Sequence, residues 1–286
     1  MSAEALESSI VHVFHPTDFS GASGLAFAHA LRVALLARAG LTLFHVDRDG
    51  EDVHWSRFPH VRETLERWKL LPAGSSRDAV AELGVDVEKV RAPAGDPVKA
   101  MLGYLRDDPA ELIVMASHAA TGLARLWQQP VAEPLARAAG SATLFLPEGA
   151  RGFVSEADGS VKLRRVLLPM DVSPGPERAL SLTLNLARAL GAEPRVTLLH
   201  VGDGGSLGPV RVPHDVRGRV ERRNVTGAVL DSIVAAAEGD DVDLVVMATR
   251  GHDGFLDALR GSTTERVLRH AKRALLAVPA EVHEPS

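Results

Sequence analysis

The chain of 286 residues is long enough for two domains, and its 45% hydrophobic and 24% charged residues are typical of a folded globular protein. A net charge of −5 gives no general attraction to nucleic acid or to anionic lipid. The absence of cysteine excludes disulfide scaffolds, thiolate metal sites and cysteine nucleophiles.

The N-terminal residues 1–10 contain two glutamates and neither lysine nor arginine, so they lack the basic and apolar regions of a signal peptide. No apolar run reaches the roughly 20 residues that are needed to span a bilayer. We therefore expect a cytoplasmic protein that binds neither membrane nor nucleic acid.

The first half of the chain alternates short apolar runs with segments of helical length. A run at 11–20 ends in Pro-x-Asp-x-Ser and precedes an amphipathic stretch at 25–37, and further apolar runs follow at 41–47, 112–118 and 142–147. These runs are short, rich in β-branched residues and bounded by polar, Gly or Pro positions. Such runs are typical of strands that are buried on both faces.

An insertion at 50–85 follows the second expected strand and contains Trp55, Phe58, Trp68 and a helical pattern at 61–71. The corresponding stretch of the second half, 204–216, is shorter and rich in Gly and Pro, which favours a mobile surface loop. A cluster of arginines after it is interpreted as a solvated loop face: Arg217, Arg219, Arg222 and Arg223.

The second half repeats the pattern of the first. Apolar runs occur at 166–173, again ending in Pro-x-Asp-x-Ser, and at 196–203, 244–250 and 274–279. Helical-length segments separate the runs in both halves, at 96–106, 177–190, 227–238 and 263–271. Strands that alternate with helices predict a parallel sheet. The predicted fold class is α/β, with two tandem doubly wound five-stranded parallel-sheet domains at 1–147 and 163–286 and a linker rich in Gly, Ser and acidic residues at 148–162.

The segment 247–271 carries a Gly-rich turn that follows an expected strand and opens an expected helix. Such a turn can direct backbone N–H groups toward a phosphate, and Gly261, Ser262 and Thr263 add free amides, hydroxyls and the positive end of a helix dipole. An ordinary loop with a serine helix cap explains the same composition equally well.

Here the chain resembles the universal stress protein family, whose nucleotide-binding members carry Gly-x2-Gly-x9-Gly-Ser/Thr after the fourth strand. Gly251, nine residues and Gly261-Ser262 match its second and third elements, and Ala248 replaces the first glycine. The resemblance covers both halves and implies an adenine nucleotide alpha hydrolase-like, Rossmann-like fold. It also implies that the second half binds ATP, together with magnesium, or AMP or ADP. The residues placed around the nucleotide are Pro169, Met170, Asp171, Val201, Met247, Ala248, Arg250, Gly251, Gly261, Ser262, Thr263 and Thr264.

The first half departs from this pattern. Ala116 and Ala119 stand where the two glycines would be, and Gln129-Pro130 replaces Gly-Ser. Proline has no amide that could contact a phosphate. We expect this half to keep the fold without binding a triphosphate, and a base or another small ligand near Asp18 is the alternative.

Three histidines end expected strands and could meet near Asp18, namely His15, His45 and His118, a set that zinc accepts. The alternative is that each imidazole makes an ordinary hydrogen bond at a strand end. We adopt the second interpretation and expect no metal.

No catalytic constellation stands out, because neither Ser20 nor Ser173 lies in a Gly-x-Ser-x-Gly motif and no Walker A lysine follows Gly261. The leading hypothesis is a regulatory protein that binds an adenine nucleotide, and its stress-response role is implied by the resemblance alone. A tandem scaffold without nucleotide and a weak ATPase are the alternatives. The halves are expected to pair through their closing strands as an intramolecular pseudo-dimer, and a homodimer of the whole chain stays open.

Overall fold

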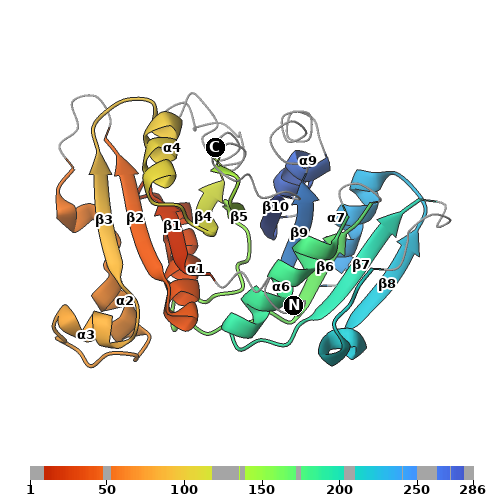
Figure 1. Cartoon of the computed structure of the whole chain (residues 1–286), viewed down its shortest axis with the longest axis horizontal. Coiled ribbons are helices and arrows are strands. Elements are labelled where there is room, and N and C mark those ends of the chain that lie inside the picture. Colours follow the sequence, from red (N-terminus) through yellow and green to blue (C-terminus); the bar gives the residue numbers. More distant parts are fainter. Residues whose placement is uncertain are drawn as a thin grey trace, which may run out of the picture.

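One continuous sheet of ten strands runs through the part of the chain that the computed structural model describes (Figure 1). The described residues are 10–47, 53–117, 135, 139–171, 175–202, 210–239, 241–249, 263–270 and 272–279. The strand order is β3-β2-β1-β4-β5-β10-β9-β6-β7-β8. The predicted α/β class with two doubly wound halves is confirmed, and the two halves share a single sheet.

The first half alternates strands and helices as predicted, and its neighbouring strands all pair in parallel. Helix α1 starts four residues before the predicted stretch, because Ser20 Oγ accepts a hydrogen bond from the Ser23 N–H and caps the helix at Gly21. The elements are β1 (His12–Pro16), α1 (Gly21–Ala37), β2 (Gly40–Val46), η1 (Trp55–Arg57), α2 (Val61–Arg67), α3 (Asp78–Glu82), β3 (Val87–Ala92), α4 (Pro97–Asp107), β4 (Leu112–Ser117) and β5 (Ala142–Pro147).

The second half repeats this topology with parallel neighbours. Its elements are β6 (Arg165–Pro169), α6 (Glu177–Ala189), β7 (Arg195–Val201), η2 (His214–Arg219), β8 (Val220–Val225), α7 (Val229–Gly239), β9 (Leu244–Thr249), α9 (Thr263–His270) and β10 (Ala274–Pro279).

The interpretation of the arginine cluster as a loop face was wrong, because Arg222 and Arg223 lie on strand β8. Preceding it, η2 buries Val216, so this part of the expected mobile loop is packed against the fold. Strand β8 is one edge of the sheet, and β3, with its charged Glu88 and Lys89, is the other. Charged side chains on edge strands prevent further strands from adding to a sheet.

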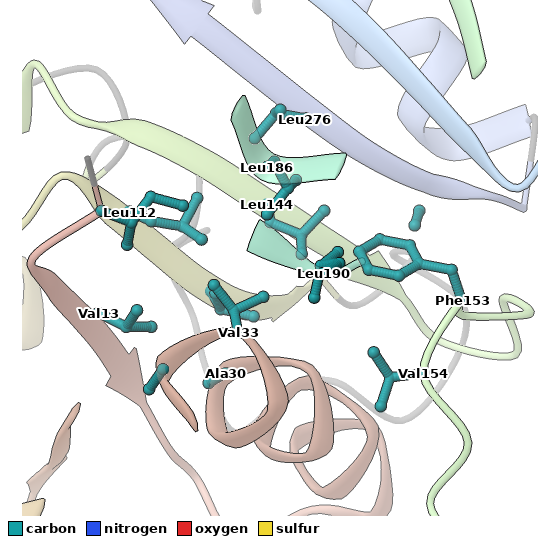
Figure 2. Packing of buried hydrophobic residues seen from close by; sticks show 14 of the residues in the cluster. Val13, Ala30, Val33, Leu112, Leu144, Phe153, Val154, Leu186, Leu190 and Leu276 are labelled. Atoms are coloured by element: carbon teal, nitrogen blue, oxygen red, sulfur yellow. The ribbon is translucent and has the colours of Figure 1, made fainter. Parts of the chain in front are cut away.

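Helices cover both faces of the sheet. Alternate side chains of each strand enter two hydrophobic clusters: Val13 of β1 belongs to the cluster that includes residues of α1, α2 and α6, whereas Phe14 belongs to the one that includes residues of α4, α7 and α9. The first cluster runs through both halves, and Figure 2 shows Val33 of α1 and Leu186 of α6 around Leu144 of β5. None of the helices in the described residues is long and apolar enough to cross a membrane.

The closing strands β5 and β10 join the halves. They pair antiparallel, with Leu144 opposite Leu276 and Phe145 opposite Leu275, and both strands are buried along their whole length. The predicted pairing through the closing strands is therefore confirmed. It pairs the backbone N–H and C=O groups of two strand edges and removes the largely apolar side chains of both strands from water.

The segment expected to be a linker is bound tightly to the first half. Phe153 and Val154 are 1% and 2% exposed, and both join the cluster between the halves (Figure 2). The Nε2 atom of buried His29 accepts hydrogen bonds from the backbone N–H groups of Phe153 and Val154, each 3.0 Å long. Trp68 Nε1 donates a further hydrogen bond of 3.1 Å to the Glu156 carbonyl oxygen. The polar composition of this segment therefore does not make it a free linker.

Stability is expected to fall as the pH drops from about 6.5 to about 4. Burial lowers the pKa of His15 and of His29 from 6.5 to about 4, so an unfolded chain binds protons in this range that the folded chain does not. Each histidine should remove about 3 kcal/mol from the free energy of unfolding over this range. Urea unfolding at a series of pH values measures the slope.

The variant His29→Gln supplies the control for this pH dependence. Its amide does not titrate, so the slope should fall by about half. An unchanged slope would mean that other groups cause the loss of stability.

Candidate functional site

The carboxyl ends of the strands separate at the centre of each half. Strand β6 pairs with β9 only at Val166–Leu244 and Leu167–Val245, whereas β6 and β7 pair over five positions. The first strand of a doubly wound sheet has neighbours whose connections run in opposite directions, and ligands bind in the crevice at this point. The candidate site of the second half therefore lies where β6 and β9 diverge, at the strand ends that carry the predicted site residues.

Four predicted site residues lie at the ends of β6 and β7. Pro169 is half-buried, Met170 is 7% exposed, and Asp171 directly after them is exposed. The Met170 N–H donates a 2.8 Å hydrogen bond to the Leu199 carbonyl of β7, which fixes the backbone from which the Asp171 carboxylate projects. Val201, half-buried, ends β7 beside them.

Strand β9 contributes the next two predicted residues. Ala248 is half-buried at the end of β9 that diverges from β6. The side chain of Met247 is buried in the cluster with α7 and α9, where it supports this strand end. Arg250, Gly251, Gly261 and Ser262 lie outside the described residues. For Thr263 and Thr264 the structure describes only the helical backbone at the start of α9.

Thr249 was missed by the sequence reasoning. It ends β9 with 3% exposure, and its Oγ1 atom is buried without a hydrogen-bond partner among the described residues. Buried hydroxyl groups nearly always have a partner, so this atom is a candidate site residue. A threonine directly before a Gly-rich turn was the signal in the sequence.

The first half has the same divergence, and β1 pairs with β4 only at Val13–Leu112 and Phe14–Ile113. Buried His15 spans the gap, and its Nδ1–H donates a 2.8 Å hydrogen bond to the Val114 carbonyl. The Nδ1–H of His45 donates one of equal length to the Thr17 carbonyl. Among the described residues no three acidic, His or Cys side chains gather as a metal-binding group, and His118 lies outside them.

A hollow of about 320 Å³ lies at the opposite edge of the second half, between the end of α6 and η2. It is lined by Arg188, Gly191, Glu193 and Arg219, and Arg219 pairs with Glu193 at 3.8 Å. This hollow is at the amino end of β7, away from the predicted site residues that the structure describes at the carboxyl ends of β6, β7 and β9.

The fold and the sequence agree with known proteins. A family model, the universal stress protein family, matches residues 12–147 and 212–279. The chain is 30% identical over 107 residues to universal stress protein A homolog 1 of Coxiella burnetii, covering 37% of this chain and 67% of that protein.

Two solved structures are similar over nearly the whole chain. A universal stress protein from Archaeoglobus fulgidus has a TM-score of 0.63 at 19% identity, covering 94% of this chain and 96% of its own. A protein of unknown function from Pseudomonas aeruginosa PAO1 has a TM-score of 0.61 at 16% identity, covering 95% of this chain and 93% of its own. These structures bear on the fold alone.

Proposed function

Because the chain belongs to the universal stress protein family, we propose that it is a regulatory stress-response protein that binds ATP or another adenine nucleotide in its second half. The nucleotide lies at the carboxyl ends of β6, β7 and β9. The observation that carries the proposal is the divergence of β6 and β9 with the exposed carboxylate of Asp171 directly after the opened strand end.

The described residues fit a nucleoside. Asp171 offers a charged acceptor for ribose hydroxyls or for the adenine amino group, and half-buried Pro169 and Val201 offer apolar surface for the base. Thr249 Oγ1 offers a hydroxyl that has no hydrogen-bond partner in the described part of the chain. Helix α9 begins directly after the Gly-rich segment, so its positive end supports a site for phosphates. Magnesium would be held chiefly by those phosphates, because Asp171 is the one carboxylate among the predicted site residues.

One ATP is expected to bind per chain, and Asp171→Ala should weaken it about ten- to a hundredfold, because a lost hydrogen bond to a charged acceptor costs about 1.5–3 kcal/mol. Calorimetric titration with ATP and magnesium gives both the stoichiometry and the affinity. The nucleotide content of freshly purified protein, read after denaturation by chromatography, is an independent measurement.

The matched control is Asp18→Ala, which removes the equivalent carboxylate from the first half and should leave ATP affinity unchanged. Asp18 Oδ1 accepts the Ser20 N–H at 3.0 Å, so thermal unfolding must show that this variant stays folded. Two equivalent sites would contradict the asymmetry of the halves. A protein that binds no nucleotide would favour the tandem scaffold, which the buried pairing of β5 and β10 also supports.

A further inference from the structure

The two strand-end histidines occupy equivalent positions in the two halves. His45 Nδ1 is 2.8 Å from the carbonyl oxygen of Thr17, and His200 Nδ1 is 3.4 Å from that of Met170. Thr17 and Met170 each precede the aspartate of a Pro-x-Asp-x-Ser motif. The same backbone position therefore orients both imidazole rings toward the carboxyl end of the sheet.

A phenylalanine covers the histidine of the first half. The rings of Phe19 and His45 have centroids 4.2 Å apart and an interplanar angle of 34°. Phe58 packs edge-on against Phe19 at 5.5 Å, and the Arg57 guanidinium lies 4.9 Å from the Phe19 centroid. The insertion that contains Arg57 and Phe58 thus holds the phenylalanine ring against the histidine.

The equivalent place in the second half is less buried. His45 and Val46 are 3% and 6% exposed, whereas His200 and Val201 are half-buried. Among the described residues no aromatic ring contacts His200, and the motif that places Phe19 after Asp18 places Val172 after Asp171. The strand-end residues of the first half are therefore more deeply buried than their counterparts in the second half.

The backbone of Phe19 supports a specific role for its ring. Its φ of +62° lies in the left-handed region, which a bulky residue rarely adopts. The Phe19 N–H donates a 3.2 Å hydrogen bond to Thr17 Oγ1, and the Ser20 N–H donates one to Asp18 Oδ1. This turn directs the ring onto His45 and engages the carboxylate that corresponds to Asp171.

We propose that Phe19 is a built-in occupant of the first-half ligand site, stacked on His45 where the planar base of a ligand stacks on His200, and that it closes this half to nucleosides. The inference rests on the proposed function of the second half. It identifies His200 as the stacking surface for the base, and it assigns the insertion the role of holding the occupant in place.

Titration with adenosine tests this inference, because adenosine needs no phosphate site. The unmodified protein should bind one equivalent per chain and Phe19→Ala should bind two. Phe19→Leu is the matched control, since it fills the space without a planar ring, and it should bind one. If Phe19→Ala does not fold, Phe19→Gly accepts the left-handed backbone and replaces it.

A reciprocal variant, Val172→Phe, should close the second half and weaken adenosine about tenfold or more. The ring protons of His45, observed by NMR, should shift in Phe19→Ala because the stacked ring is gone. One equivalent for both the unmodified protein and Phe19→Ala would overturn the inference and leave the proposed function intact. If the unmodified protein bound no adenosine and Phe19→Ala bound one equivalent, the proposed function alone would be refuted. No binding to either would overturn both.

Discussion

Gly152→Ala is expected to lower the free energy of unfolding by about 3–5 kcal/mol, because the added methyl group would displace a buried, hydrogen-bonded ring. A Cβ atom at this position would lie 2.6 Å from His29 Nε2 and still closer to Cε1. Displacing the His29 ring would break hydrogen bonds, since its Nδ1–H donates to the Leu25 carbonyl and its Nε2 accepts from the N–H groups of Phe153 and Val154. Urea unfolding at pH 7.5 measures the loss.

The control is Gly103→Ala in helix α4, where a Cβ atom would meet nothing within 4 Å. This change should raise stability by up to about 1 kcal/mol, because glycine disfavours a helix. A Gly152→Ala variant as stable as the unmodified protein would show that the connecting segment is not held by His29.

Gly261→Val is expected to weaken ATP about a hundredfold or more, because a branched side chain would occupy the space in which backbone amides approach the phosphates. Adenosine lacks phosphates, so its affinity should change by less than about threefold. Asp171→Ala should weaken both ligands alike, and this contrast separates the phosphate end of the site from the nucleoside end.

The outcome depends on a folded variant, because Gly261 lies outside the described residues and a turn of the fold can itself require a glycine. Thermal unfolding and retained adenosine binding are therefore measured on the same preparation. If ATP affinity is unchanged in a folded Gly261→Val protein, the phosphates do not bind at this motif.

Most of the architecture could be predicted because it depends on local patterns. Short apolar runs that alternate with amphipathic segments gave the strands, the helices and their parallel order, and strands β5 and β10 have the predicted bounds. The charged strand β8 was missed because it lacks such a local pattern. An edge strand with exposed Arg222 carries no apolar run, so its pattern is that of a solvated loop.

The docking of the connecting segment could not be predicted, because its partners are distant in the chain. His29 and Phe153 are 124 residues apart, and a segment rich in Gly, Ser and acidic residues has the composition of a linker. The need for glycine at position 152 can be recognised only once the position of the His29 ring beside it is known.

The candidate site was predicted in part. The ends of β6 and β7 lie together because the two strands pair in parallel, as predicted, whereas the binding roles of the residues there and of the Gly-rich motif stay predictions. Thr249 was indicated in the sequence by its place before the Gly-rich turn, and its hydroxyl is buried without a partner among the described residues, whereas Phe19 is identified only by its left-handed backbone and its stacking. Neither property has a signature in sequence periodicity.

The antiparallel pairing of β5 with β10 within one chain has a consequence for how the two halves can change. In a dimer of identical chains every substitution occurs on both sides of the twofold axis, so a phenylalanine that fills one site fills both. Here each half is encoded separately, so the closing of one site that we propose for Phe19 does not extend to the other half, whose sequence has Val172 at the equivalent position. On this proposal the chain has the division of roles of a heterodimer, and its two unlike halves stay in a one-to-one ratio at any dilution.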